Sequence, residues 1–552
     1  MSGDLGGFFF SAHPAILVIP ARGEELRPGE GMENVVTAQT ADLVGQHFIV
    51  DFSGPEITPE LERLVRDGRI GGVILFAKNV RTTAQVRTLT ADLQHLAAEA
   101  GLPPLLVTID QEGGVVNRLV EGFTVFPGAM ALGATGRAED AAAAGRITAL
   151  ELRALGINTN HAPVLDVNTN PANPVIGIRA FGDDPALVSR LGVAYLQAAQ
   201  AAGVLTTVKH FPGHGDTALD SHLDLPTVAK DPARLRGEEL RPFAEAIRAG
   251  ADGVLSAHIV YPAFDRSRPA TLSAPVMQGL LRGELGFEGV VFTDSMEMKA
   301  ISDRWSRGAA AVEALRAGCD LILACGRTDG QWAAIEAVRQ AVTDRSLDGA
   351  AMRASEARIA RVKTRYAGRP TGWATETAAT GTAAHQLLAQ EIADRAVTLV
   401  RSVAGAIPLA GGRVVVVNAG GGAGERPPTG LGQELAQILS GVTMAGSPDE
   451  VARGSWDTVV VASLSLRRYE GVDPVRALHQ RFNERLIVVG IGSPYELLRF
   501  PEVTTYLATY GPDPASLRAA AKVLAGMLEP SGRLPVALPG LYERGWRFTA
   551  RA

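Results

Sequence analysis

The sequence predicts an α/β protein in which a (β/α)8 barrel of the TIM type is followed by a smaller α/β sandwich domain. The chain has 552 residues. This is longer than a single hydrophobic core usually supports, so at least two domains are expected. In the first two thirds, short apolar runs alternate with alanine-rich amphipathic stretches, which is typical of parallel strands covered by helices. Polar or charged residues follow most of these runs, where a barrel gathers its functional groups.

Eight apolar runs are the expected barrel strands, and the stretches between them are expected helices. The strands are predicted at 47–52, 72–76, 105–109, 156–160, 204–209, 253–256, 289–293 and 320–324. Helices are predicted at 138–155, 186–202 and 232–249, and a helix at 349–366 closes the barrel.

The domain boundaries follow from composition. Residues 1–39 are expected to be an N-terminal extension, because no basic region precedes their apolar runs and Pro14 interrupts them, unlike a secretory signal; Met32 would be an equally good start. The barrel is expected at 40–366, and a linker rich in Gly, Thr, Ala and Pro at 367–384. A second α/β pattern occupies 385–552, with strands predicted at 396–400, 413–418, 458–462, 486–490 and 504–508.

Composition narrows the class of partner. A net charge of -6 and a pI near 6.0 provide no basic surface for nucleic acid. No run of about 18 apolar residues is present, so we expect no membrane-spanning helix.

Cys319 and Cys325 bracket a predicted strand of roughly 20 Å, whereas a disulfide tolerates about 7 Å between α-carbons. Free thiols are therefore expected, in keeping with a cytoplasmic protein. The sequence indicates no oligomeric state and no cofactor.

The run from Lys209 to His222 contains three histidines, one lysine and two aspartates among glycines and a proline. Such a loop on a rigid scaffold predicts part of an active site. Within it, Asp220 and His222 are two residues apart, which in an extended stretch puts both side chains on one side. Asp220 could then orient His222 and raise its pKa, as in an acid/base dyad. A contact that only stabilises the loop is the alternative.

Other candidate residues lie at the ends of the predicted strands. These residues are Asp110, His161, Lys209, His210, His258 and Asp294. Asp294 could be a catalytic carboxylate or simply the N-cap of the next helix. Asp110 and Arg118 could grip sugar hydroxyls from two sides.

A metal site is a weaker hypothesis. His210 and His214 are four residues apart and His222 and Asp216 are near, a set that suggests zinc or manganese. However, Pro212 and Gly213 break any helix that would bring the first pair together. We therefore predict no metal.

Four motifs in order resemble those of the β-N-acetylglucosaminidases of glycoside hydrolase family 3, across roughly residues 40–365. They are the run 209–215 with 220–222, the segment 109–114 with Arg118-Leu119, the segment 179–185, and the segment 292–296. The region 385–552 resembles the C-terminal sandwich of longer family members.

The resemblance implies a role for each matched residue: Asp294 as nucleophile, His222 as acid/base, and Asp220 as the partner of His222. It also implies that Asp110, Arg118, Arg179, Lys209 and His210 bind the terminal sugar, and His258 is added from its strand-end position. The implied activity is retaining hydrolysis of terminal β-linked N-acetylglucosamine from cell-wall (muropeptide) or chitin-type fragments. The alternatives are a phosphorylase, a β-glucosidase or β-xylosidase, a metal-dependent hydrolase, and a sugar-binding protein without activity.

Overall fold

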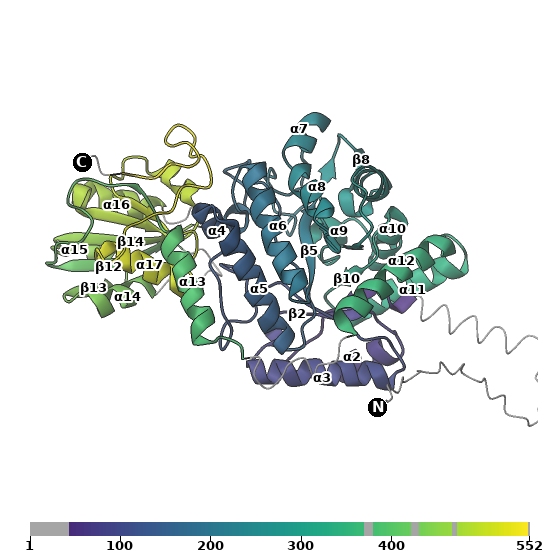
Figure 1. Cartoon of the computed structure of the whole chain (residues 1–552). Coiled ribbons are helices and arrows are strands. Elements are labelled where there is room, and N and C mark those ends of the chain that lie inside the picture. The colour runs from purple at the N-terminus through teal and green to yellow at the C-terminus, as the bar shows by residue number, and fades with distance from the viewer. Residues whose placement is uncertain (1–43, 369–378, 421–429, 466–471, 550–552) are drawn as a thin grey trace, which may run out of the picture.

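The computed structural model describes residues 44–368, 379–420, 430–465 and 472–549. Figure 1 shows two α/β units, an N-terminal barrel and a C-terminal sheet domain. The predicted N-terminal extension lies outside the described residues, and so does most of the predicted linker.

Eight parallel strands form the first sheet, in the order β10-β1-β2-β3-β4-β5-β6-β9. A bridge between Phe292 and Leu321 connects the two end strands, so the sheet is a nearly closed barrel. The strands are β1 (Phe48–Val50), β2 (Gly72–Leu75), β3 (Leu106–Ile109), β4 (Thr159–Asn160), β5 (Leu205–Phe211), β6 (Gly253–Ser256), β9 (Val290–Phe292) and β10 (Ile322–Ala324). Each overlaps one of the eight predicted strands, and the predicted fold class is confirmed.

Helices surround this sheet: α2 (Pro59–Arg66), α3 (Thr83–Glu99), α4 (Ala129–Thr135), α5 (Ala138–Ala154), α6 (Pro185–Ala201), α7 (Pro232–Gly237), α8 (Leu240–Arg248), η4 (Pro275–Glu284), α9 (Lys299–Ser302), α10 (Arg307–Ala317), α11 (Thr328–Thr343) and α12 (Gly349–Val362). Several begin with a Thr or Asp cap followed by proline; in α6, Asp184 accepts a hydrogen bond from the Ala186 amide and Pro185 is the first helical residue. None of the described helices has the length and apolarity to cross a bilayer.

Two segments of the barrel differ from the prediction. The helix expected at 232–249 is two helices, α7 and α8, because Gly237 weakens the helix and Glu238 and Glu239 turn toward Lys230. A short antiparallel ribbon, β7 (Val260–Tyr261) with β8 (Asp265–Pro269), was not predicted. Its second strand carries mostly exposed polar residues and therefore no apolar signal.

The C-terminal domain contains a six-stranded sheet in the order β11-β16-β15-β14-β12-β13. The strands are β11 (Thr398–Arg401), β12 (Val414–Gly420), β13 (Val442–Ala445), β14 (Thr458–Leu464), β15 (Leu486–Gly490) and β16 (Tyr506–Ala508). Among the described strands of this sheet, only β11 pairs antiparallel, with β16 as its partner. Alternate residues of β12 and β14 face two different cores. Helices α13 (Ala383–Ala396), α14 (Gly430–Ile438), α15 (Pro448–Arg453), α16 (Val472–Phe482) and α17 (Pro514–Leu524) complete the sandwich.

The two domains share one of these cores. Met130 and Ala131 of α4 pack in the same apolar cluster as Leu534 and Val536 of the C-terminal segment. In Figure 1, α4 and α13 lie at the boundary between the domains. The C-terminal segment approaches the barrel so closely that a Cβ at Gly182 would lie 2.4 Å from the Pro535 carbonyl oxygen. The second domain is therefore packed firmly against the barrel.

The cysteines are free thiols, as predicted from the sequence. Burial raises the pKa of both Cys319 and Cys325, which keeps the thiols neutral.

Candidate active site

Charged and polar side chains gather at the carboxyl ends of the barrel strands, as the sequence predicts. Asp110 directly follows β3 and His161 directly follows β4, while His258 and Asp294 lie two residues beyond β6 and β9. Because all the strands run in parallel, these ends meet at one face of the barrel.

Lys209 and His210 are consecutive residues of β5, yet both contribute to the same site. In a regular strand, successive side chains point to opposite faces. The pairing between β5 and β6 shifts register between Val208 and Phe211, so β5 is irregular at Lys209 and His210, where the peptide bond between the two residues is also cis. The alternation of a regular strand does not hold here, and both side chains reach groups of the site.

A network of buried charges occupies one side of this face. The Lys209 ammonium lies 2.8 Å from Asp110 Oδ1 and 2.6 Å from Glu112 Oε1. Arg179 donates two parallel hydrogen bonds to Glu112, at 2.9 and 2.8 Å. Each charge is therefore compensated, which a buried ion requires. The network brings together three predicted sugar-binding residues, Asp110, Arg179 and Lys209.

The pKa values of the network follow from this pairing. Burial raises the pKa of the Glu112 carboxyl, but the charges of Arg179 and Lys209 outweigh burial and lower it to about 2. Burial also raises the pKa of Asp110, and the Lys209 charge reverses that effect, so the net shift is downward. For Lys209, burial lowers the pKa, but Asp110 and Glu112 bring it above the ordinary value. All members of the network are charged at neutral pH.

Replacing Glu112 by glutamine is expected to lower the free energy of unfolding by about 3 kcal/mol at pH 7, because Lys209 and Arg179 lose their shared counter-charge. Glu112 has a lowered pKa in the folded protein, so its stabilisation is present above its unfolded pKa and is lost as pH falls toward 2. Urea denaturation at pH 7 and at pH 3 measures both effects.

The matched control is Glu62→Gln. Glu62 forms an exposed ion pair with Arg66 at 2.8 Å, a type worth about 1 kcal/mol or less. Equal losses for the two variants would contradict the assignment of Glu112 as the centre of a buried network.

Arg118 completes this side of the site. Its Nη2 lies 3.6 Å from Asp110 Oδ2, and its guanidinium lies over the Phe76 ring, 5.7 Å from the ring centroid. The buried Nε of Arg118 has no hydrogen-bond partner in the described part of the chain. The Arg118 side chain is therefore held at the edge of the site with at least one hydrogen-bond donor unused.

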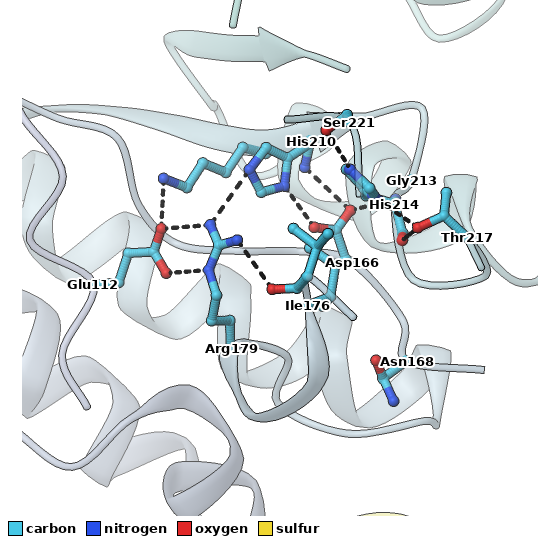
Figure 2. Close-up of polar contacts among 12 residues, drawn as sticks. Glu112, Asp166, Asn168, Ile176, Arg179, His210, Gly213, His214, Thr217 and Ser221 are labelled. Atoms are coloured by element: carbon cyan, nitrogen blue, oxygen red, sulfur yellow. Dashed lines mark hydrogen bonds and ion pairs between the residues drawn. The ribbon is translucent and has the colours of Figure 1, made fainter. Parts of the chain in front are cut away.

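Asp166 forms a second centre of the site. It lies in the segment after β4 and is fully buried. Its Oδ2 lies 2.7 Å from His210 Nδ1, and its Oδ1 accepts hydrogen bonds from the backbone amides of His210 and His214, at 3.2 and 2.6 Å. Figure 2 shows this carboxylate between the two histidines, with Arg179 beyond His210. One carboxylate thus fixes the ring of His210 and the backbone of both histidines.

Asp220 and His222 are in contact. His222 Nδ1 lies 2.7 Å from Asp220 Oδ1, and the His222 backbone amide donates to the same oxygen at 2.9 Å. The hydrogen bond that His222 donates to Asp220 raises the pKa of His222, and the Asp294 charge also raises it, against the effect of burial. The His222 side chain is 59% exposed, so its ring is accessible from outside.

The backbone that brings this pair together differs from the prediction. Residues 220–223 form a turn, closed by hydrogen bonds from the Leu223 and Asp224 amides to the Asp220 carbonyl, instead of an extended stretch. An aspartate that bonds the backbone two residues ahead commonly forms such a turn. The loop is also less loosely held than its glycines suggest, because His214, Thr217, Asp220 and Ser221 are buried.

Asp294 is half-buried after β9, and the Ser295 amide donates to its Oδ1 at 2.7 Å. Burial raises the pKa of Asp294, but the neighbouring charges of His258, His210 and His222 lower it, and the net shift is downward. Asp294 does not cap a helix, since α9 begins only at Lys299 and is preceded by Met298. The alternative role as an N-cap is therefore wrong.

His258 contacts the protein through both ring nitrogens. Nδ1 lies 2.8 Å from Thr271 Oγ1 and Nε2 lies 3.0 Å from the Ser295 carbonyl oxygen. The ring therefore supports the segment that follows Asp294. Direct contact between His258 and a sugar stays a prediction.

The structure brings the predicted residues to one face of the barrel and adds three that sequence reasoning did not select, Glu112, Asp166 and His214. Glu112 lies within a motif that contains Asp110, and His214 lies in the histidine loop, so a signal existed for both. Asp166 is a lone carboxylate in the apolar run 162–167, an unusual position for a buried charge that could have identified it. Within the described ranges, no group of three or more His, Cys, Asp or Glu side chains could hold a metal ion.

A family model described as the glycosyl hydrolase family 3 N-terminal domain matches residues 38–362. Beta-hexosaminidase A of Pseudoalteromonas piscicida is 39% identical over 415 residues, which cover 68% of this chain and 69% of that protein.

Solved structures are also similar to this chain, one of them over both domains. A glycoside hydrolase family 3 beta-N-acetylglucosaminidase from Paenibacillus sp. str. FPU-7 is 40% identical with a TM-score of 0.86, covering 90% of this chain and 98% of that one. NagZ from Neisseria gonorrhoeae, in complex with N-trifluoroacetyl-D-glucosamine, is 31% identical with a TM-score of 0.53 and covers 63% of this chain and 96% of its own.

Proposed function

The chain belongs to glycosyl hydrolase family 3, and on that premise we propose that it is a retaining, exo-acting β-N-acetylglucosaminidase. It removes terminal β-linked N-acetylglucosamine from an oligosaccharide or glycoconjugate through a covalent intermediate on Asp294.

One observation carries this proposal: two titratable groups at one face have pKa values shifted in opposite directions. The pKa of Asp294 is lowered, so the carboxylate is ionised at neutral pH and can attack. The pKa of His222 is raised by Asp220, which favours the protonated imidazole that a proton donor needs. Such a divergence is what assigns a nucleophile and an acid within one site.

In the first step, an Asp294 carboxylate oxygen attacks the anomeric carbon while the bond to the leaving oxygen breaks. That oxygen takes a proton from His222. Asp220 is bound to Nδ1, so Nε2 is the nitrogen that exchanges the proton with substrate. The Asp220 carboxylate stabilises the imidazolium before the transfer and fixes the ring orientation.

In the second step, a water molecule replaces the departed leaving group. His222, now neutral, takes a proton from this water, whose oxygen attacks the anomeric carbon and releases Asp294. Two inversions at the same carbon retain the β configuration. A histidine here takes the place of the carboxylic acid that most glycosidases use for proton transfer.

The charge network provides the sugar-binding part of the site. We assign Asp110, Arg118, Arg179, Lys209 and His210 to the terminal sugar, as the family resemblance implies. Network members already paired with each other need little reorganisation when hydroxyl groups of the sugar replace water.

The acetamido sugar is the proposed substrate because of the similar proteins. A relative with 69% of its length covered is named a beta-hexosaminidase, and the Neisseria structure holds an N-acylated glucosamine derivative. Muropeptide or chitin-type fragments are the proposed natural substrates. The free thiols Cys319 and Cys325 support a cytoplasmic location, where disulfides rarely persist.

The test is hydrolysis of the p-nitrophenyl β-glycosides of N-acetylglucosamine, glucose and xylose, each with and without millimolar phosphate and a chelator. The proposal expects a strong preference for the acetamido sugar, unaffected by either addition, with the β anomer released first in proton NMR. Phosphate-dependent formation of a sugar 1-phosphate would instead identify a phosphorylase. Loss of activity with the chelator would identify a metal-dependent enzyme, and activity on the glucoside or xyloside alone would reassign the substrate.

A bell-shaped dependence of kcat/KM on pH is expected. Activity falls at low pH when Asp294 takes up a proton, below the ordinary pKa of 3.8, and falls at high pH when His222 loses its proton, above the ordinary 6.5. In Asp220→Asn the pKa of His222 should fall, so the high-pH limb should move to lower pH. Initial rates at low substrate concentration across pH 3–9 measure both limbs.

Asp224→Asn is the control, because Asp224 lies on the same turn but pairs with Arg304 at 2.7 Å. A high-pH limb that stays in place in Asp220→Asn would exclude Asp220 as the partner that sets the His222 pKa.

A further inference from the structure

His214 is built into the protein more firmly than a loop residue needs to be. Its side chain and backbone are 2% exposed. The backbone amide donates to Asp166 Oδ1 at 2.6 Å, and the backbone carbonyl accepts from Asn173 Nδ2 at 2.8 Å. The backbone of His214 is therefore fixed to the segment after β4, independently of the contacts that its ring makes.

The ring of His214 bridges two points of the loop. Nδ1 lies 2.8 Å from Thr217 Oγ1, and Nε2 lies 3.1 Å from Ser221 Oγ. Figure 2 shows the ring between these two hydroxyl groups. Ser221 is the residue between Asp220 and His222, and it is 2% exposed although its neighbour His222 is largely open.

The neutral ring can form both hydrogen bonds. With the proton on Nδ1, this nitrogen donates to Thr217 Oγ1, whose own proton goes to the His214 carbonyl at 3.2 Å, and Nε2 accepts from the Ser221 hydroxyl. Burial and the His210 charge lower the pKa of His214 to about 4, so the ring keeps this neutral form at neutral pH.

A backbone hydrogen bond also holds Ser221: the Ala300 amide donates to its carbonyl at 3.3 Å. The flanking Leu219 and Leu223 are 51% and 58% exposed and so provide little packing. The bond from Ser221 to His214 therefore ties the residue between Asp220 and His222 to the barrel, in addition to the ion pair of Asp224 with Arg304 further along the turn.

We propose that His214 is a positioning residue for the reaction: its neutral ring holds Ser221 and so fixes the Asp220–His222 pair relative to the bound sugar. The Asp166 carboxylate binds both His210 and the backbone of His214. It therefore holds a sugar-binding residue directly and the proton donor His222 indirectly, through His214 and Ser221. The proposal rests on the proposed function, since it needs His222 to be the proton donor.

The test compares Ser221→Ala with two isosteric replacements of the ring. In His214→Gln the amide lies near the position of Nε2 and can still accept from Ser221. In His214→Asn it lies near the position of Nδ1 and reaches only Thr217. Each enzyme is assayed with the 2,4-dinitrophenyl β-N-acetylglucosaminide, whose leaving group needs no proton, and with a β-linked disaccharide, whose leaving group does.

We expect Ser221→Ala and His214→Asn to lose about tenfold or more in kcat/KM on the disaccharide and less than about twofold on the dinitrophenyl substrate, as a displaced proton donor would. His214→Gln should stay within about threefold of the unmodified enzyme on both substrates. Ser221→Ala removes only one oxygen, so folding is preserved, and thermal denaturation verifies this for each variant.

His47→Leu is the control for replacing a buried histidine. His47 precedes β1, at the end of the strand away from the candidate site, and its Nδ1 lies 2.8 Å from the Asp320 carbonyl oxygen. Loss of the His47 ring should lower stability without changing the ratio of the two activities. Equal losses on both substrates in Ser221→Ala and His214→Asn, or no loss, would overturn the positioning role. His222→Ala is assayed in parallel. If it does not lose more activity on the disaccharide than on the dinitrophenyl substrate, the proposed function itself fails. If His222→Ala shows this difference but Ser221→Ala and His214→Asn do not, only the role of His214 fails.

Discussion

Replacing Asp294 by asparagine is expected to lower kcat by about 10⁴-fold or more, because the amide cannot form the covalent bond to the anomeric carbon. Asparagine has the same shape and can still accept the 2.7 Å hydrogen bond from the Ser295 amide, so the fold should be retained. The loss therefore reports chemistry, and KM should change far less than kcat.

Mass spectrometry provides a direct measurement. A 5-fluoro derivative of N-acetylglucosaminyl fluoride should leave a sugar mass on the peptide that contains Asp294 in the unmodified enzyme and none in Asp294→Asn. Asp348→Asn is the control, since Asp348 caps α12 and asparagine caps a helix equally well. An Asp294→Asn enzyme that keeps more than a few per cent of activity would exclude Asp294 as nucleophile.

Replacing His222 by alanine should have an effect that depends on the leaving group. Proton donation contributes about 10²–10⁴-fold to rate, so disaccharides should lose activity by that factor. Dinitrophenyl glycosides leave without a proton, and their first step should proceed nearly unchanged. The second step then becomes limiting, because no base activates water.

Azide tests that second step. It is a nucleophile that needs no base, so it should restore turnover of the dinitrophenyl substrate by His222→Ala and produce the β-glycosyl azide. The matched control is His95→Ala, an exposed histidine paired with Glu99 on α3. Equal loss on all substrates, or no glycosyl azide, would mean that another group transfers the proton.

The barrel was predictable from sequence because its strands are buried on both faces. The run around β3 is buried at every position and apolar except at Thr108, and such runs are bounded by helix signals. The sheet of the second domain was predicted less completely: β13 is an edge strand with two exposed residues, Thr443 and Met444, and its alternating pattern is too short to identify.

The site was predictable as a set of residues but not as a network. Asp110, Lys209 and Arg179 were selected by motif. Glu112 was not, because its ion-pair partners Arg179 and Lys209 lie 67 and 97 positions away in the chain. Asp166 was missed for the same reason, because its bond to His210 spans 44 positions. Contacts of this kind arise from strand order, so a local pattern can mark Glu112 or Asp166 as unusual but cannot show which residue each one contacts.

The Asp220–His222 contact illustrates a prediction that succeeded through a different geometry. An extended backbone was expected to align the two side chains, whereas a turn closes them on each other. The aspartate bonds both the ring and the backbone amide of His222, so the pair depends on residue type at the i, i+2 spacing more than on strand conformation.

The core that α4 shares with the C-terminal segment sets an order of events during translation. Met130 and Ala131 are synthesised long before Leu534 and Val536, which belong to the same apolar cluster in the finished protein. At 5–20 residues per second, the interval is roughly tens of seconds, time enough for the barrel strands to pair on the ribosome. During that interval the nascent barrel presents the bare apolar face of α4, so newly made chains should depend on chaperones until the last segment emerges.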